Sequence, residues 1–445
     1  MRFVSTRGAR DGVTLSGAIV QGIAADGGLL VPEQIPALPW RQWDPSLPLS
    51  ALAERLIAPF AEEDPLAADL GAICREAFDF PAPVVPLAHA HASVLELFHG
   101  PTCAFKDFGA RFLAASLERI QRAGGRRVTV LVATSGDTGG AVAAAFYRRP
   151  HVDVVLLYPQ GLVSPRQAQQ LACWGENVRT FAVGGTFDDC QRIVKEAFRD
   201  PALARAYDLS SANSINVGRL LPQMVYYAAA SLDVWHRTRR LASFIVPSGN
   251  LGNVTACVWA REAGLPIGEI VLATNANRPV SEFLATGEWR PRASVATLAS
   301  AMDVGNPSNI ERLRALFPDR LADHMSAHLV TDDQIRDTIR HDYAARGYVW
   351  DPHGATAAYV HHHLDADRLA EPWVIVATAH PAKFNEIVEP LIGREVEVPA
   401  ALASLLRRPR HEEDLEPTID ALRARMLEAE THTGDHGNSR AGDSS

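Results

Sequence analysis

The stretch Val128–Tyr147, VTVLVATSGDTGGAVAAAFY, decides the fold. Its β-branched start predicts a short strand over 128–132, the small polar residues 133–140 predict a loop, and the alanine-rich end predicts a helix over 141–147. The same order of strand, loop and helix recurs at 152–158 with a helix from Ser164, and at 178–183 with a helix over 187–198. This alternation predicts a mostly parallel sheet covered by helices on both faces.

Outward from this stretch, the chain divides into three parts. Residues 1–80 form a separate-looking unit that ends at the proline-rich connection 81–86. We expect a catalytic core over 81–430, with a smaller subdomain at about 110–200, and a disordered tail over 431–445, where the residues are small and polar. Within the core we further expect strands at 243–246, 269–274 and 373–377, a long helix over 218–237, and irregular structure over 278–310.

Composition narrows the class of protein. A formal net charge of −9, with no basic cluster between aromatic residues, argues against nucleic acid as a partner. There is no apolar run of 18 residues and no secretory signal, so we expect no membrane partner and a cytoplasmic location. Five scattered cysteines without a Cys-x-x-Cys pair predict reduced, buried thiols and no zinc site.

Lys106 is the candidate catalytic residue. It lies between Phe105 and Phe108 at the predicted start of a helix, where burial of its amine would lower its pKa and suit it to Schiff-base chemistry. A lone lysine at a helix start more often extends its ammonium group to water, so only the neighbouring motifs can decide between these interpretations.

Polar loops follow several of the predicted strands, at the sheet edge where ligands bind in open α/β proteins. The loop 248–253 contains Gly249 and Gly252 and precedes a helix, an arrangement that can hold a phosphate through backbone N–H groups. The loop 134–140 offers hydroxyl groups, the segment 213–219 ends in Arg219, and Thr378 follows a buried-looking strand. Each motif alone is also typical of ordinary turns and helix caps.

Other motifs point away from metal and nucleotide chemistry. Consecutive side chains on a helix diverge, so we expect His361, His362 and His363 to be exposed and not to share one metal ion. The signatures of P-loop NTPases, zinc hydrolases and serine hydrolases are absent from the sequence.

Five ordered motifs together resemble the threonine synthase family: residues 99–108, 133–139, 213–219, 246–253 and 377–384. The openings 5–8 and 26–29 resemble the amino-terminal domain of the bacterial and fungal branch of this family. The resemblance implies a fold type II α/β enzyme dependent on pyridoxal 5'-phosphate, with two three-layer parallel-sheet domains, the site between them, and a small N-terminal α+β domain. It implies a lyase of threonine biosynthesis that converts O-phospho-L-homoserine and water to L-threonine and phosphate, as a monomer or homodimer.

The resemblance also implies residue roles. Lys106 matches the lysine that carries the cofactor and moves protons. The implied cofactor-binding residues are Lys106, Asp137, Ser248, Gly249, Asn250, Leu251, Gly252, Asn253 and Thr378. The implied substrate-binding residues are Thr134, Ser135, Thr138, Ser214 and Arg219. A related phospho-lyase that releases a keto acid is the alternative activity, and the sequence separates the two poorly.

Overall fold

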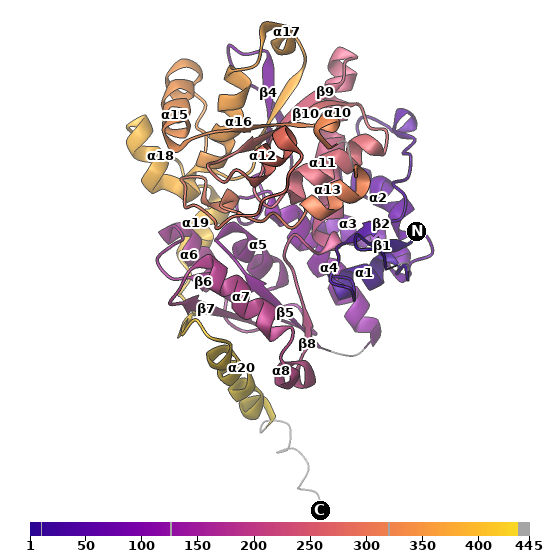
Figure 1. Ribbon diagram of the computed structural model, residues 1–445, viewed down its shortest axis with the longest axis vertical. Helices are drawn as coiled ribbons and strands as arrows, with labels where there is room; N and C mark the ends of the chain where they lie inside the picture. The colour runs from indigo at the N-terminus through magenta and orange to yellow at the C-terminus, as the bar shows by residue number, and fades with distance from the viewer. Residues whose placement is uncertain (10, 125–126, 319–320, 435–445) are drawn as a thin grey trace, which may run out of the picture.

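The computed structural model describes residues 1–9, 11–124, 127–318 and 321–434. Two mostly parallel sheets, each covered by helices, lie one above the other in Figure 1, and the amino-terminal elements pack at their side. The predicted tail over 431–445 divides at residue 434, because helix α20 (Ile419–Gly434) includes its first residues and the rest lies outside the described residues.

The larger sheet has six strands in the order β11-β10-β9-β12-β4-β3. All neighbours are parallel except β3, which runs antiparallel to β4. The strands are β3 (Val84–Pro86), β4 (Ala92–Glu96), β9 (Ala242–Pro247), β10 (Ile267–Thr274), β11 (Ser326–Leu329) and β12 (Trp373–Ala377). Its helices are α10 (Met224–Thr238), α11 (Gly252–Glu262), α12 (Pro279–Thr286), α13 (Ile310–Leu316), α14 (Leu321–His324), α15 (Asp332–Arg346), α16 (Pro352–His362), α17 (Ala366–Leu369) and α18 (Asn385–Ile392). Helix α19 (Ala400–Leu406) packs on α6 (Pro165–Ala172) of the smaller sheet.

The smaller sheet has five parallel strands in the order β13-β7-β6-β5-β8. They are β5 (Val128–Ala133), β6 (Val152–Pro159), β7 (Val178–Val183), β8 (Asp208–Ser210) and β13 (Glu413–Leu415). Its helices include α5 (Asp137–Phe146), α6 (Pro165–Ala172), α7 (Phe187–Ala197), α8 (Pro201–Ala206) and α20. The parallel arrangement predicted from 128–147 is confirmed, and the chain returns to this sheet at its carboxyl end.

The amino-terminal part shares a core with the rest of the molecule. It contains β1 (Phe3–Ser5), paired antiparallel with β2 (Leu30–Pro32), and the helices α1 (Leu15–Gln21), α2 (Leu49–Ile57) and α3 (Leu70–Ala77). Buried side chains of α1 and α2 join one apolar cluster with those of α4 (Lys106–Gly124). Glu76 of α3 also pairs with Arg149, and at 3.2 Å with Arg119 of α4. The amino-terminal part therefore packs directly against α4, the helix that begins at Lys106.

Four local predictions are wrong. Helix α5 begins at Asp137, four residues earlier than predicted, because Thr134 Oγ1 accepts a hydrogen bond from the amide of Gly139 in its first turn. The long helix over 218–237 is divided at Pro222 into α9 (Val217–Leu220), a 3₁₀ turn over 221–223 and α10, since proline interrupts helical hydrogen bonding. The segment 278–310 contains helix α12. His361 is only 4% exposed, because α16 packs against both α15 and the larger sheet.

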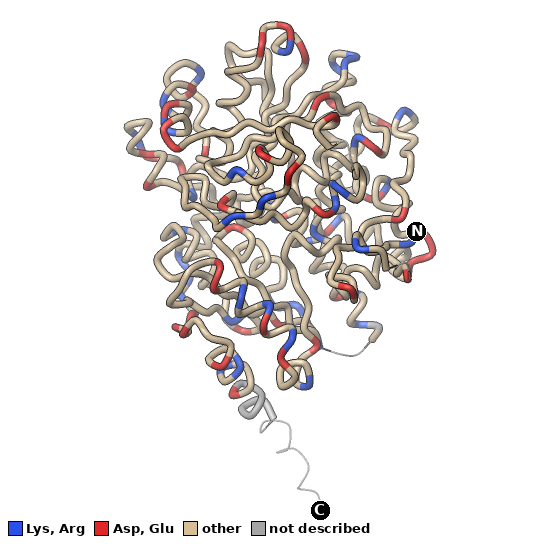
Figure 2. Tube along the Cα trace, in the orientation of Figure 1, with Lys and Arg blue, Asp and Glu red and all other residues tan. Residues whose placement is uncertain are grey.

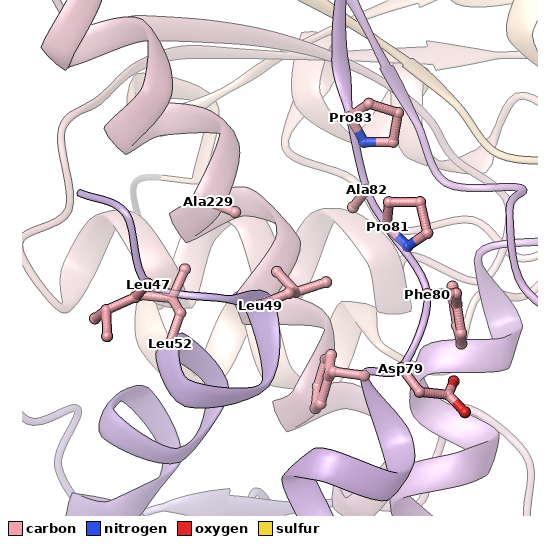
Figure 3. A pocket seen from close by; sticks show the side chains of 10 residues that line it. Leu47, Leu49, Leu52, Asp79, Phe80, Pro81, Ala82, Pro83 and Ala229 are labelled. Atoms are coloured by element: carbon pink, nitrogen blue, oxygen red, sulfur yellow. The ribbon is translucent and has the colours of Figure 1, made fainter. Parts of the chain in front are cut away.

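Three further observations concern the described residues. Basic and acidic residues are mixed along the trace in the view of Figure 2. No helix in the described ranges is long and apolar enough to cross a membrane. A hollow of about 410 Å³ lies between Leu49 of α2, the connection 81–83 and Ala229 of α10 (Figure 3), and none of the predicted site residues lines it.

Candidate active site

Lys106 lies where the chain before α4 pairs with the chain after β12. The amide of Phe105 donates to the carbonyl of Thr378 at 2.9 Å, and the amide of His380 donates to the carbonyl of Cys103 at 3.0 Å. These bonds continue the pairing of the chain beyond the carboxyl end of β12 and up to the start of α4. They bring Lys106 and Thr378 together from distant parts of the sequence.

The Lys106 amine faces a carboxylate at the edge of the smaller sheet. Its Nζ lies 4.0 Å from Oδ2 of Asp137, and the lysine side chain is 14% exposed. Burial lowers the pKa of Lys106 to about 8, the charge of Asp137 acts against that shift, and the charges of Lys383 and Arg219 add to it. The predicted burial and lowered pKa of Lys106 are both found, while its catalytic role stays a prediction.

Asp137 is the most heavily engaged carboxylate of the site. Its Oδ1 accepts hydrogen bonds from Lys383 Nζ at 2.8 Å and from Gln167 Nε2 at 2.9 Å. Burial alone would raise the pKa of Asp137, but the charges of Lys383, Lys106 and His353 outweigh it and hold that pKa well below its usual range. Asp137 therefore stays ionised in the buried site.

The three hydroxyl residues around Asp137 differ in what they can offer a ligand. Thr134 is 1% exposed, and its Oγ1 accepts from the amides of Gly136 at 3.1 Å and Gly139 at 2.8 Å. Ser135 and Thr138 are half-buried, and within the described residues their side chains make no hydrogen bond. Thr134 thus shapes the loop, whereas Ser135 and Thr138 stay available at the start of α5.

The segment 213–219 connects the lysine to the glycine-containing loop. Arg219 is 2% exposed, donates from Nη1 to the carbonyl of Ala212 at 2.5 Å, and has an Nε without a partner in the described chain. Burial lowers the pKa of Arg219 to about 10. At the other end of the segment, Ser214 Oγ accepts from Asn250 Nδ2 at 2.6 Å.

The loop 248–253 joins β9 to α11 and presents backbone donors. Among the described residues, the amides of Gly249, Asn250, Leu251 and Gly252 donate to no protein group. Ser248 is 5% exposed, and its hydroxyl donates to the carbonyl of Val246 at 3.0 Å. A Cβ on Gly249 would lie 2.6 Å from Met302 Cα, so this position has no room for a side chain.

Asn253 is buried at the end of this loop. Its Oδ1 accepts from Tyr226 at 2.6 Å and from Tyr227 at 2.9 Å, while its buried Nδ2 has no partner in the described chain. Free amides at the start of a helix, with an unpaired amide nitrogen beside them, fit a phosphate group. The residues present therefore suit a phosphate-bearing cofactor with an aldehyde that Lys106 can take.

Sequence reasoning missed two cations in this region. Arg312 of α13 is fully buried and donates to the carbonyls of Leu30, Ser214 and Ile215 at 2.6–3.1 Å. Lys383 is also fully buried. A signal for Lys383 was present in the composition, since only three of the 43 Lys and Arg residues are lysines: Lys106, Lys195 and Lys383.

Metal ligands are not gathered here or elsewhere in the described ranges, where no group of three or more His, Cys, Asp or Glu side chains could hold an ion. All five cysteines are buried free thiols, as predicted.

Comparison with known proteins assigns the chain to a family. Residues 82–379 match the family described as pyridoxal-phosphate dependent enzyme, residues 2–78 match threonine synthase N terminus, and residues 354–426 match threonine synthase, C-terminal. The threonine synthase of Haemophilus influenzae is 39% identical over 431 residues, covering 96% of this chain and 100% of the relative. The chain belongs to the threonine synthase family.

Solved structures of threonine synthases agree with the assignment. The Escherichia coli threonine synthase structure has a TM-score of 0.88 at 39% identity and covers 96% of this chain and 100% of that one. The structure of PLP-bound threonine synthase from Brucella melitensis has a TM-score of 0.88 at 34% identity, with coverages of 96% and 99%. The fold is therefore that of the fold type II pyridoxal-phosphate enzymes, and the predicted cofactor and family are confirmed.

Proposed function

We propose that this member of the threonine synthase family converts O-phospho-L-homoserine and water to L-threonine and phosphate, with Lys106 as its catalytic residue. The observation that carries the proposal is the buried Lys106 amine, 4.0 Å from Asp137 and shifted to a pKa of about 8, in a chain of this family. An amine with such a pKa can hold a carbonyl cofactor and exchange protons near neutral pH.

We infer the cofactor-binding roles from the hydrogen-bond donors that have no protein acceptor in the described site. When bound, pyridoxal 5'-phosphate supplies an electron sink that stabilises negative charge on substrate carbons. The amides of 249–252 and Nδ2 of Asn253 would hold its phosphate at the start of α11. Thr378, placed beside Lys106 by the Phe105 hydrogen bond, would offer a neutral hydroxyl to the pyridine nitrogen.

The substrate-binding roles follow the remaining polar groups. Ser135 and Thr138, at the start of α5, would take the substrate carboxylate, with Thr134 holding their loop in shape. Ser214 and Arg219 would take the substrate phosphate, where the unpaired Nε of Arg219 marks a donor in need of an acceptor.

Lys106 would serve each proton transfer of the reaction. Its amine would accept the protons that leave Cα and Cβ and would return protons to Cγ and Cα, while phosphate leaves Cγ and water adds its hydroxyl group at Cβ. The buried Asp137 carboxylate stabilises the lysine each time it carries a proton. A site closed to bulk water while these steps proceed would limit hydrolysis to a keto acid.

The experiment that tests the proposal measures products. Purified protein should show the visible absorption of a lysine-linked cofactor and should release phosphate from O-phospho-L-homoserine with threonine in equal amount. Lys106→Ala should lose both, while Lys195→Ala, which removes the exposed third lysine, should keep both. Phosphate release with a keto acid in place of threonine would favour the alternative phospho-lyase.

We also propose that the protein acts in the cytoplasm. The five buried, unpaired cysteines support a reducing compartment.

A further inference from the structure

Lysine is almost absent from this chain, and two of its three copies meet in the site. Arginine supplies nearly all other positive charge, and the third lysine, Lys195, is exposed on α7. Lysine differs from arginine in carrying a compact charge on a flexible stem, without a planar fork. Its presence at 383 therefore indicates a position that needs one small, localised charge.

Lys383 joins three elements that surround Lys106. It lies in the 3₁₀ turn over Pro381–Phe384 that follows β12, and none of its surface is exposed. Its Nζ lies 2.8 Å from Asp137 Oδ1 on α5 and 2.8 Å from the carbonyl of Thr102, in the loop before α4. Thr102 in turn donates from its amide and its hydroxyl to Asp107, the neighbour of Lys106.

Asp137 divides its two oxygens unequally between the lysines. Oδ1 makes a close ion pair with Lys383 at 2.8 Å, whereas Oδ2 stays 4.0 Å from Lys106. A buried carboxylate without Lys383 would form its close pair with Lys106 and hold that amine protonated. Lys383 therefore occupies the contact that would otherwise immobilise the catalytic amine.

We propose that Lys383 is a positioning residue for Lys106: its buried ammonium occupies Asp137 and leaves the Lys106 amine beside a carboxylate without a close ion pair. This inference rests on the proposed role of Lys106. The charged and titratable groups around the two lysines are Asp137, Arg219, His353, His380, Asp107 and Cys103.

The alternative is that Lys383 only tethers three elements. Gln167 provides the matched control, because its Nε2 donates to the same Asp137 oxygen at 2.9 Å without a charge. A tether would make the loss of either residue equivalent for Lys106. A charge effect would make only the loss of Lys383 change the titration of Lys106.

The test measures the titration of Lys106 directly. The full-length chain, freed of cofactor and shown by circular dichroism to be folded, is labelled with trace acetic anhydride between pH 6 and 11. Mass spectrometry of peptides reads Lys106, with exposed Lys195 as internal reference. We expect Lys383→Met to raise the pKa of Lys106 by about one unit or more, because a nearby positive charge is lost. Gln167→Leu should shift it by less than about 0.3 unit, because it removes an uncharged donor and no charge.

Asp137→Asn should shift Lys106 in the opposite direction, because it removes the one negative charge that faces the amine. If Lys383→Met does not fold, the double variant with Asp137→Asn removes both buried charges together. Its Lys106 pKa should lie between those of the wild type and Asp137→Asn.

Several outcomes would overturn the proposal. They are an unchanged Lys106 titration in folded Lys383→Met, an equal shift in Gln167→Leu, or a Lys106 pKa in the double variant at or below that of Asp137→Asn. Labelling needs no turnover, so a protein that shows the expected shifts but makes no threonine would refute the proposed function and leave the role of Lys383 standing.

Discussion

The two halves of the site are built from different physical groups. Around Lys106, the structure gathers buried charges: Lys383, Asp137 and Arg219. Around the loop 248–253, it offers neutral donors, namely backbone amides and the side chain of Asn253. The lysine half should therefore respond strongly to charge changes and to pH, whereas the loop half should respond to shape.

The largest expected effect is on the lysine half. Asp137→Asn leaves Lys383 buried without its carboxylate, which should lower the free energy of unfolding by about 3–5 kcal/mol. It should also lower kcat by at least about 100-fold, since Lys106 loses its charged neighbour. Urea unfolding and steady-state kinetics measure the two effects. Asp153→Asn, which removes an exposed partner of Arg127, should change stability by less than about 1 kcal/mol; equal losses in both variants would contradict the comparison.

In the loop half, an added side chain should weaken cofactor binding. Gly249→Ala places a methyl group 2.6 Å from Met302 Cα, which should displace the loop and weaken cofactor binding by roughly ten- to a hundred-fold. Equilibrium binding of pyridoxal phosphate, followed by absorbance, measures this loss. Gly124→Ala, where a Cβ meets nothing within 4 Å, is the control. Unchanged affinity in Gly249→Ala would show that the loop can adjust.

The pH dependence should separate the halves without mutation. Below a pKa of about 8, Lys106 is mostly protonated, so its capture of the cofactor aldehyde should speed up about tenfold per pH unit and level off above pH 8. Stopped-flow absorbance of the cofactor-free chain measures this rate. Pyridoxine phosphate, which lacks the aldehyde, should bind with no step near pH 8; such a step would place the titrating group in the loop half.

The pKa of Lys106 also has a consequence for stability. Because it lies below the ordinary value of 10.5, the unfolded chain binds this proton more tightly, so this residue's contribution to stability rises between about pH 8 and 10.5.

The smallest effect is expected where the halves join. Ser214→Ala removes the acceptor of Asn250 Nδ2, a bond of 2.6 Å, which should cost about 1 kcal/mol or roughly fivefold in KM. Steady-state kinetics with Ser404→Ala, an exposed serine on α19, as control would test this. A loss as large as that of Asp137→Asn would show that the halves are not independent.

Much of the fold could be predicted because its signals are local. The β-branched run at 128–132 and the proline at 165 predict a strand and a helix start from neighbouring residues alone, and both are found. Pro222 was visible too, but where the helix breaks also depends on distant segments, because α9 packs on α4 whereas α10 packs on α11 and α2.

The site was predicted less completely, because hydrogen-bond partners are set by tertiary structure. Thr134 resembles a ligand-binding residue, but its hydroxyl is turned toward two amides of its own loop. Lys383 lies in the motif 377–384, but only the folded structure shows that it is buried against Asp137. The rarity of lysine in the chain was the one available clue.

The contact between Lys383 and Thr102 spans 281 residues of sequence, which affects the order in which the site forms during synthesis. On the ribosome, the amino-terminal elements that pack on α4 emerge first and Lys106 follows, but Lys383 emerges only 281 residues after Thr102. Contacts so far apart in sequence form late in folding. A nascent chain that has not reached Lys383 thus carries Lys106 without the residue that pairs with Asp137, so we expect cofactor chemistry to begin only after Lys383 has emerged.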